Sequence, residues 1–188
     1  MPDFNDPRIR HLRVPRRFEY VDERICPVVY KSYYAAEVAN RVSEAVNLFL
    51  VRADIGECGV GTIHRLPLPN DPDRERRTDC SYVSYARWPA DRPGSYTANA
   101  WDVVPDLVAE VASFDTPAEN LMARVGEYLR AGVRLVWAVY PLTRQIHAYW
   151  AGANTIRVYT AADELDAGDI LPGFRTPVAP LFPPVTPA

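Results

Sequence analysis

Two acidic residues stand out because they interrupt segments that otherwise resemble buried β-strands. Glu110 lies inside the apolar segment DLVAEVA, and Asp79 begins the segment TDCSYVSYA, which alternates and is rich in β-formers. A carboxylate is costly to bury unless it is paired. Two carboxylates, a backbone carbonyl and waters together form an oxygen-rich site that suits Mg²⁺ or Mn²⁺. The pattern therefore indicates a candidate metal site shared by Asp79 and Glu110.

A third acid, Asp106, lies four residues before Glu110 on the same expected strand and on the same face. The two would be about 13 Å apart along the strand, too far to hold one ion directly. A neighbouring strand must then supply the partner of Glu110, and Asp79 is the natural candidate. Purely structural roles stay open, because Asp79 or Asp106 could cap a turn and Arg124 could neutralise Glu110 in a buried ion pair.

Other catalytic patterns are absent from the sequence. It contains no GxxxxGK[ST], no GxGxxG after a strand, no HExxH and no G-x-S-x-G setting for a serine. A net charge of -3 argues against a protein that coats nucleic acid through bulk charge. The sequence has one lysine, Lys31, just before the first expected long helix, and no pattern directs it towards the two acids.

Cysteine usage and hydropathy predict a cytoplasmic protein. The three cysteines are widely spaced and form no CxxC pair, which argues against a zinc ribbon and a disulfide framework. No apolar stretch approaches the length of a membrane span, and the N-terminal segment has no apolar core of the kind found in signal peptides.

The elements expected to position the acids form an α/β (α+β) fold with a mixed central sheet flanked by helices. Apolar residues at helical spacing predict helices over 33–53 and 116–131. Apolar strands are expected over 103–112 and 134–140. With the helix between them, these two strands make a β-α-β unit, whose strands should be parallel neighbours joined by a right-handed crossover.

The remaining segments complete the expected architecture. FEYVDERICPVVY predicts a strand or hairpin, and RQIHAYWA should pair with the strand before it, followed by a further strand, TIRVYT. GVGTIHRL is expected to be one strand and LPNDPDRERR a loop. The proline-rich end, from DILPGFRTP onwards, should drape over the body without a regular element. The expected domain organisation is a basic, flexible arm over 1–17, a single domain over 18–182 and a Pro-rich tail over 183–188.

The segment PDLVAEVASFDTPAENLMARVGEYLRAGVRLVWAVYP resembles the Uma-two family of restriction endonucleases, a branch of the PD-(D/E)XK nuclease superfamily. That family reads P-D-L-V-V-E-V-L-S-P-S-T, then a helix, then Y-x-x-A-G-V-x-x-Y-W-V-V-D-P. RFEYVDERI, TDCSYVS and LPGFRTPVAPLF resemble the family's opening, P-D-V-S-F-V and closing segments. The resemblance covers residues 18–182 and implies a restriction-endonuclease-like core.

The resemblance also implies roles for individual residues. Asp79 and Glu110 match the family's metal-binding acids, and the carbonyl of Val111 would be a third ligand to Mg²⁺ or Mn²⁺. The superfamily's catalytic lysine matches Arg124, four residues before Tyr128. An arginine keeps the positive charge but is a poor acid–base group near neutral pH. The resemblance therefore implies metal-dependent hydrolysis of DNA phosphodiester bonds, weakened by Arg124.

Three functions stay open on the sequence alone. The first is a metal-dependent DNA endonuclease with Asp79, Glu110 and Arg124 as catalytic residues. The second is a nuclease-fold protein that has lost catalysis and acts in nucleic-acid or protein binding. The third is an unrelated structural protein in which Glu110 and Arg124 form only a buried ion pair. DNA is the expected partner, and a homodimer is expected because nucleases that cut both strands often pair.

Overall fold

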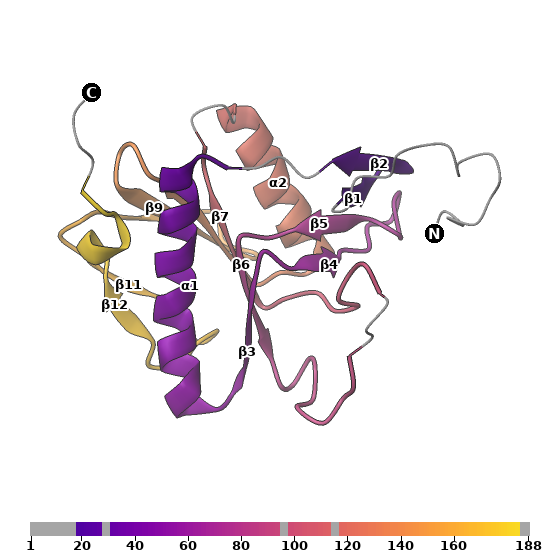
Figure 1. The fold of residues 1–188 in the computed structure, drawn as a ribbon, viewed down its shortest axis with the longest axis horizontal. Helices are drawn as coiled ribbons and strands as arrows, with labels where there is room; N and C mark the ends of the chain where they lie inside the picture. The colour runs from indigo at the N-terminus through magenta and orange to yellow at the C-terminus, as the bar shows by residue number, and fades with distance from the viewer. Residues whose placement is uncertain (1–17, 28–30, 95–97, 114–116, 185–188) are drawn as a thin grey trace.

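A computed structural model describes residues 18–27, 31–94, 98–113 and 117–184. Its centre is a six-stranded sheet in the order β10-β9-β8-β7-β6-β3, and only the β7–β8 pair is parallel (Figure 1). The strands are β3 (Gly56–Val60), β6 (Cys80–Ser84), β7 (Leu107–Val111), β8 (Leu135–Tyr140), β9 (Gln145–Trp150) and β10 (Ile156–Tyr159). The mixed sheet expected from the sequence is confirmed.

Two helices, α1 (Tyr33–Ala53) and α2 (Ala118–Ala131), cover opposite faces of this sheet (Figure 1). Side chains alternate between the two faces along a strand. In β7, Leu107, Ala109 and Val111 share a core with α1, whereas Val108 shares a second core with α2. This alternation puts Glu110 on the face covered by α2.

The first helix has the predicted bounds, and local sequence explains both of its ends. The hydroxyl of Ser32 accepts a hydrogen bond from the backbone N–H of Ala35, which caps the first turn. At the other end Asp54 adopts a left-handed conformation with φ 48°, and its N–H donates to the carbonyl of Leu50. Position 31 therefore lies directly before the capped start of α1.

The predicted β-α-β unit is confirmed as β7-α2-β8, with β7 and β8 paired in parallel. The helix ends at Gly132, whose φ of 102° is the left-handed conformation that glycine adopts without strain. The expected start of this helix at residue 116 lies outside the described residues. In the unit, α2 crosses the face of the sheet that carries Glu110.

Two short hairpins lie together beside the main sheet, β1 (Phe18–Val21) with β2 (Arg24–Pro27) and β4 (Ile63–Arg65) with β5 (Glu75–Arg77). The first hairpin was predicted. The second corrects two predictions, because GVGTIHRL is split between β3 and β4 and part of the expected loop LPNDPDRERR forms β5. The cause is a turn at Gly61, where φ is 60° and the chain leaves the main sheet.

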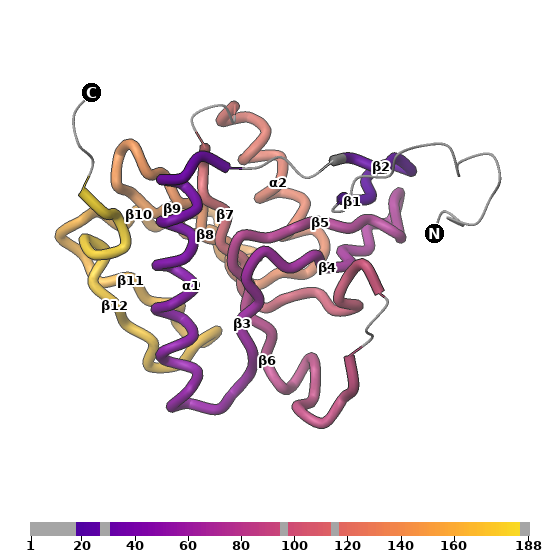
Figure 2. Tube along the Cα trace, in the orientation of Figure 1, coloured from indigo at the N-terminus to yellow at the C-terminus, as the bar shows by residue number. Residues whose placement is uncertain are grey.

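The proline-rich end contains regular elements, which corrects the prediction that it has none. β12 (Arg175–Pro177) pairs with β11 (Glu164–Asp166), and a 3₁₀ turn, η1, follows at Ala179–Leu181. A two-stranded edge tolerates proline, and apolar side chains of this segment join the core of α1. Figure 2 shows this pair on the side of α1 away from the two hairpins.

The structure describes little of the two predicted terminal segments, the basic arm and the Pro-rich tail. The predicted basic arm, residues 1–17, lies outside the described residues, as do residues 185–188 of the predicted tail. Among the described helices, none combines the length and apolar character that crossing a membrane would require.

Candidate active site

The two predicted acids, Asp79 and Glu110, lie where β6 and β7 meet. Glu110 belongs to β7, and Asp79 lies directly before β6, which pairs antiparallel with β7 and sets Cys80 opposite Ala109. The side chain of Asp79 reaches the backbone N–H of Val111, the residue after Glu110. Both acids are buried, with 5% and 4% of their surface exposed. The ladder between β6 and β7 therefore brings together two carboxylates that lie far apart in the chain.

The Asp79 carboxylate is held between a backbone amide and an ammonium group. Its Oδ2 accepts a hydrogen bond of 2.7 Å from the N–H of Val111 and lies 2.9 Å from the Lys31 Nζ. The same Lys31 Nζ donates to the carbonyl oxygen of Val111. One cationic group thus contacts two of the three oxygen donors that the family resemblance assigns to a metal.

Glu110 is paired from α2. Its Oε1 accepts hydrogen bonds of 3.0 Å from the Arg124 Nη2 and 2.5 Å from the Tyr128 hydroxyl. Burial raises the pKa of Glu110 above its usual range, and the adjacent Arg124 opposes that rise. Asp79 raises the same pKa, which places the two carboxylates within electrostatic reach of each other. Burial also raises the pKa of Tyr128, so this hydroxyl stays protonated and donates a hydrogen bond to Glu110.

Arg124 is fixed by several acceptors at once. Besides Glu110, its Nη2 contacts the carbonyl of Arg77 at 2.6 Å and the Glu19 Oε1 at 3.3 Å. Burial alone would lower the pKa of Arg124, but Glu110 raises it, and the net direction is upward. The guanidinium is therefore a permanent charge that ties Glu110 to the first hairpin.

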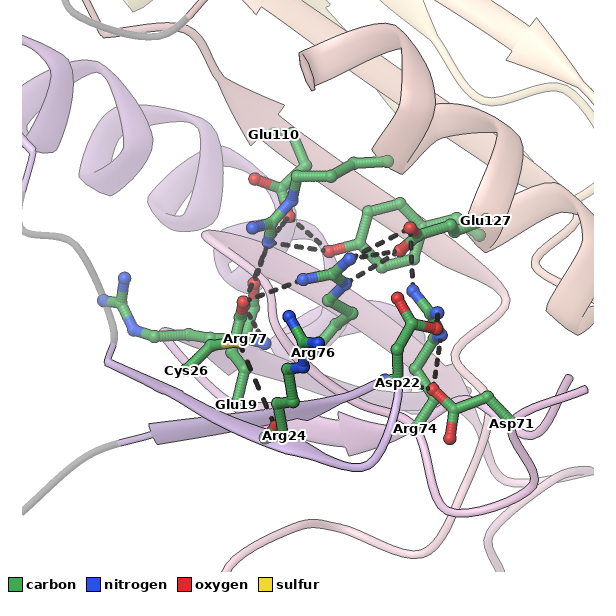
Figure 3. A network of polar contacts seen from close by, with 12 residues as sticks. Glu19, Asp22, Arg24, Cys26, Asp71, Arg74, Arg76, Arg77, Glu110 and Glu127 are labelled. Atoms are coloured by element: carbon green, nitrogen blue, oxygen red, sulfur yellow. Dashed lines mark hydrogen bonds and ion pairs between the residues drawn. The ribbon is translucent and has the colours of Figure 1, made fainter. Parts of the chain in front are cut away.

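The contacts of Arg124 continue into a larger set of ion pairs that joins both hairpins to α2 (Figure 3). Arg76 pairs with Glu127 of α2 at 2.7 Å and with Glu19 of β1 at 3.1 Å. Arg74 pairs with the same Glu127 at 2.8 Å and with Asp71 at 3.0 Å. These pairs hold the two hairpins against the helix that positions Arg124.

Glu110 and Arg124 are in direct contact, and Asp79 lies within electrostatic reach of Glu110, whereas Asp106 has other partners. Asp106 accepts a hydrogen bond from the Ser84 N–H and pairs with Arg87 at 2.9 Å, which is the structural role left open for it. Sequence reasoning missed the position of Lys31. Its one signal was its uniqueness as the only lysine, because the approach of residue 31 to β6 and β7 depends on how α1 packs on the sheet.

The arrangement can accept a cation. The oxygens of Asp79 and Val111 already receive the Lys31 ammonium, and Glu110 adds a second buried carboxylate nearby. In the described part of the chain, no cluster of three or more His, Cys, Asp or Glu side chains could hold a metal. A metal ion at this site would therefore depend on two carboxylates, a backbone carbonyl and water.

Comparison with known proteins bears on this geometry. A family model described as "Uma2: Putative restriction endonuclease" matches residues 9–179. The chain belongs to this family. A crystal structure from Anabaena variabilis, titled as a putative nuclease belonging to DUF820, has a similar fold with a TM-score of 0.73 at 16% identity. The similarity covers 88% of this chain and 89% of that chain. No match was found among curated proteins.

Membership of the Uma2 family confirms the resemblance found in the sequence, and the similar structure confirms the fold class. The sequence identity of 16% carries the fold alone. The roles of Asp79, Glu110, Arg124 and the Val111 carbonyl stay predictions, supported by the contacts described above.

Proposed function

We propose that this Uma2 protein is a Mg²⁺- or Mn²⁺-dependent endonuclease that hydrolyses DNA phosphodiester bonds. The observation that carries the proposal is that two buried carboxylates, Asp79 and Glu110, lie within electrostatic reach of each other where β6 and β7 meet, with the backbone of Val111 beside Asp79. Hard, divalent cations prefer such oxygen donors. Family membership supports the same reaction class.

Asp79, Glu110 and the carbonyl of Val111 would hold the metal. Arg124 and Tyr128 bind the Oε1 of Glu110, so its Oε2 is the atom that would face the ion. When bound, such an ion supplies charge stabilisation at the phosphate and lowers the pKa of a water molecule. The fixed contacts of Glu110 keep this carboxylate from rotating as the substrate binds.

Lys31 supplies the mobile positive charge of the proposed site. Unlike the planar guanidinium, an ammonium group is a compact charge on a flexible stem and can follow a bound phosphate. The side chain of Lys31 is 19% exposed, and its Nζ lies 2.9 Å from Asp79. We assign Lys31 to contact the scissile phosphate or the attacking water, whereas Arg124 positions Glu110. In this proposal Lys31 takes the role that the superfamily's catalytic lysine would have at position 124, where this chain has an arginine.

The test combines metal binding with cleavage. Titration calorimetry should detect Mn²⁺ binding to the wild type, and supercoiled plasmid should be nicked when Mn²⁺ is added. Asp79→Asn and Glu110→Gln keep the side-chain shape but remove one negative charge each, so both should lose metal binding and nicking. Asp169→Asn is the matched control and should keep both, because this exposed carboxylate pairs with Arg134, directly before β8, at the end of β7 and β8 away from Val111.

A second function is favoured by one observation, the Lys31 ammonium already bound to Asp79 and Val111. An internal cation could replace the metal and leave a nuclease fold that only binds nucleic acid or protein. In that case DNA binding persists in Asp79→Asn, and no nicking occurs with any divalent ion. Nicking that continues unchanged in both acid variants would overturn the endonuclease proposal. Pairing of two chains as a homodimer stays a prediction that sedimentation velocity would test.

A further inference from the structure

A second cavity, here called the tryptophan groove, adjoins the candidate active site. Its volume is about 660 Å³, within the range of roughly 300–1,000 Å³ typical of small-molecule sites. Gly61 and Arg77 line both this groove and the smaller pocket that contains Lys31 and Asp79. A ligand bound at Asp79 could therefore extend into the groove along one continuous wall.

Two tryptophans form an aromatic corner in the groove. The rings of Trp88 and Trp101 lie 5.5 Å apart and nearly perpendicular, at 79°. Trp101 is also stacked on the buried His64, with centroids 5.4 Å apart. Its backbone N–H donates to the carbonyl of Ile63 at 2.8 Å, which joins the Trp101 segment to β4. The corner is thus fixed by its neighbours before any ligand binds.

Positive charge lies on both sides of this corner. The guanidinium carbon of Arg92 lies 3.9 Å above the Trp88 ring. Arg77 lies against Gly61, and an added Cβ there would come within 2.8 Å of its Nη2. Figure 3 shows the Arg77 side chain extending away from the ion-pair network. Within the described residues, the buried Nε of Arg77 has no hydrogen-bond partner.

The groove differs from an ordinary surface hollow because it combines aromatic rings with the guanidinium groups of Arg77 and Arg92. One carboxylate, Glu57, also lines it, so charge alone would attract an anion weakly. Aromatic rings stack on every nucleobase, and arginines add contacts to phosphate and to the π-face of a base. In a duplex the faces of a base are already stacked, so only an unpaired or extruded base could lie against Trp88.

We propose that the tryptophan groove binds an unstacked nucleobase of the nucleic-acid strand whose phosphate is held at the Asp79 site. The base lies against Trp88 and Trp101, Arg92 covers the stack, and Arg77 contacts the phosphate between groove and active site. This inference rests on the proposed nuclease function and narrows its substrate to single-stranded or locally unpaired strands.

The test is fluorescence anisotropy with a labelled oligothymidylate, in EDTA so that cleavage does not interfere. A labelled abasic strand of the same length keeps the phosphates and removes the bases. The wild type should bind oligothymidylate more tightly than the abasic strand. Trp88→Ala should weaken oligothymidylate binding by roughly 5- to 150-fold, the usual effect of losing one base–aromatic stack. Trp88→Ala should leave abasic-strand binding unchanged.

A second titration, with labelled oligouridylate, shows whether the groove also accepts RNA. Loss of oligouridylate binding in Trp88→Ala supports the proposal equally.

A matched pair of surface variants guards against misfolding of Trp88→Ala. Arg92 and Arg157 are both exposed and both lie over an aromatic ring, but Arg157 is on β10, at the sheet edge opposite β3. Arg92→Ala should weaken oligothymidylate binding several-fold, and Arg157→Ala should leave it unchanged. Trp88→Phe, which keeps a ring, should restore most of the affinity.

The outcomes separate this inference from the proposed reaction. Three results would each contradict the proposal that the groove binds a nucleobase. They are equal affinity for the abasic and thymidylate strands, equal effects of Arg92→Ala and Arg157→Ala, and no oligonucleotide binding at all. Metal-dependent nicking that depends on Asp79 would still support the endonuclease. Conversely, base-dependent binding lost in Trp88→Ala, without any nicking, supports the groove and contradicts the endonuclease.

Discussion

At the scale of single residues, the side chain that matters most for the proposed chemistry is Lys31. A divalent ion at the proposed site would compete with its ammonium for the oxygens of Asp79 and Val111. We predict that Lys31→Gln binds Mn²⁺ more tightly than the wild type, because the competing charge is gone. Cleavage should nevertheless fall by roughly 10²–10³-fold, the usual effect of losing one group that stabilises the charge developing on the reacting atoms. Calorimetry and plasmid nicking measure the two effects separately.

The control for this variant is Arg52→Gln, which removes a positive charge from the last turn of α1. It should change neither Mn²⁺ affinity nor nicking, since it lies at the opposite end of the helix from Lys31. If Lys31→Gln binds Mn²⁺ less tightly than the wild type, then the lysine stabilises the metal site rather than competing for it. If Lys31→Gln nicks plasmid as fast as the wild type, Lys31 takes no part in the reaction.

Arg124 leads to a second prediction at this scale, which concerns stability. Arg124→Met keeps the length of the side chain but leaves Glu110 without its cationic partner. Breaking a buried pair in this way typically costs about 3–5 kcal/mol, and the free energy of unfolding in urea should fall by about that much. The double variant Arg124→Met, Glu110→Gln should recover part of the loss. A fall below about 1 kcal/mol in the single variant would show that solvent already screens the pair.

The contact of Glu110 with Arg124 could be predicted from the sequence, because a carboxylate inside an apolar strand must be paired in the fold. No sequence pattern gave a position for Lys31 or for the groove formed by Trp88 and Trp101. Those positions depend on how separate segments pack: the start of α1 against β7, and the segment around Trp101 against β4. Local periodicity carries no information about such contacts between distant segments.

At the scale of elements, His64 links β4 to the main sheet and gives a pH prediction. It is fully buried between the Val103 carbonyl, 3.1 Å from its Nδ1, and the Ser81 hydroxyl, 2.8 Å from its Nε2. Burial lowers its pKa to about 4 from the ordinary 6.5 of an imidazole, although the Val103 contact opposes this. The folded protein therefore keeps His64 neutral where the unfolded chain would be protonated.

The direction in which stability changes with pH follows from that difference in proton binding. The stabilising contribution of neutral His64 is complete above pH 6.5 and is lost as the pH falls towards 4, by about 3 kcal/mol in total. Urea unfolding at several pH values should show this loss in the wild type. His64→Gln is less stable at neutral pH but should lack this part of the pH dependence. If the free energy of unfolding changes with pH equally in the wild type and in His64→Gln, His64 is not the cause of the loss of stability at low pH.

The elements that the sequence predicted best are those with long, consistent periodicity. Helix α1 has the bounds expected, and β7-α2-β8 forms the parallel unit, because each buries one continuous apolar face. The errors fall on three-residue strands. β5 carries the charged sequence ERR and is held by β4 and by Glu19, so its local composition resembles a loop. β12 is a comparable case, flanked by prolines and stabilised by its neighbours.

At the scale of the whole molecule, the net charge of -3 requires that any nucleic acid be bound through a local cluster of cations. Lys31, Arg77 and Arg92 line the candidate active site and the tryptophan groove.

Each phosphate neutralised on a single strand contributes about -0.7 to the slope of log K against log salt concentration. The two phosphate contacts, Lys31 and Arg77, predict a slope of about -1.4 for oligothymidylate, well short of the slopes of proteins that cover nucleic acid with positive charge. Arg77→Ala should reduce its magnitude by about 0.7, and Arg157→Ala should not. Anisotropy titrations at several NaCl concentrations measure the slope. A magnitude above about 5 would mean that many more cations contact the strand than these two cavities contain, and the bound surface would then have to lie elsewhere on the molecule.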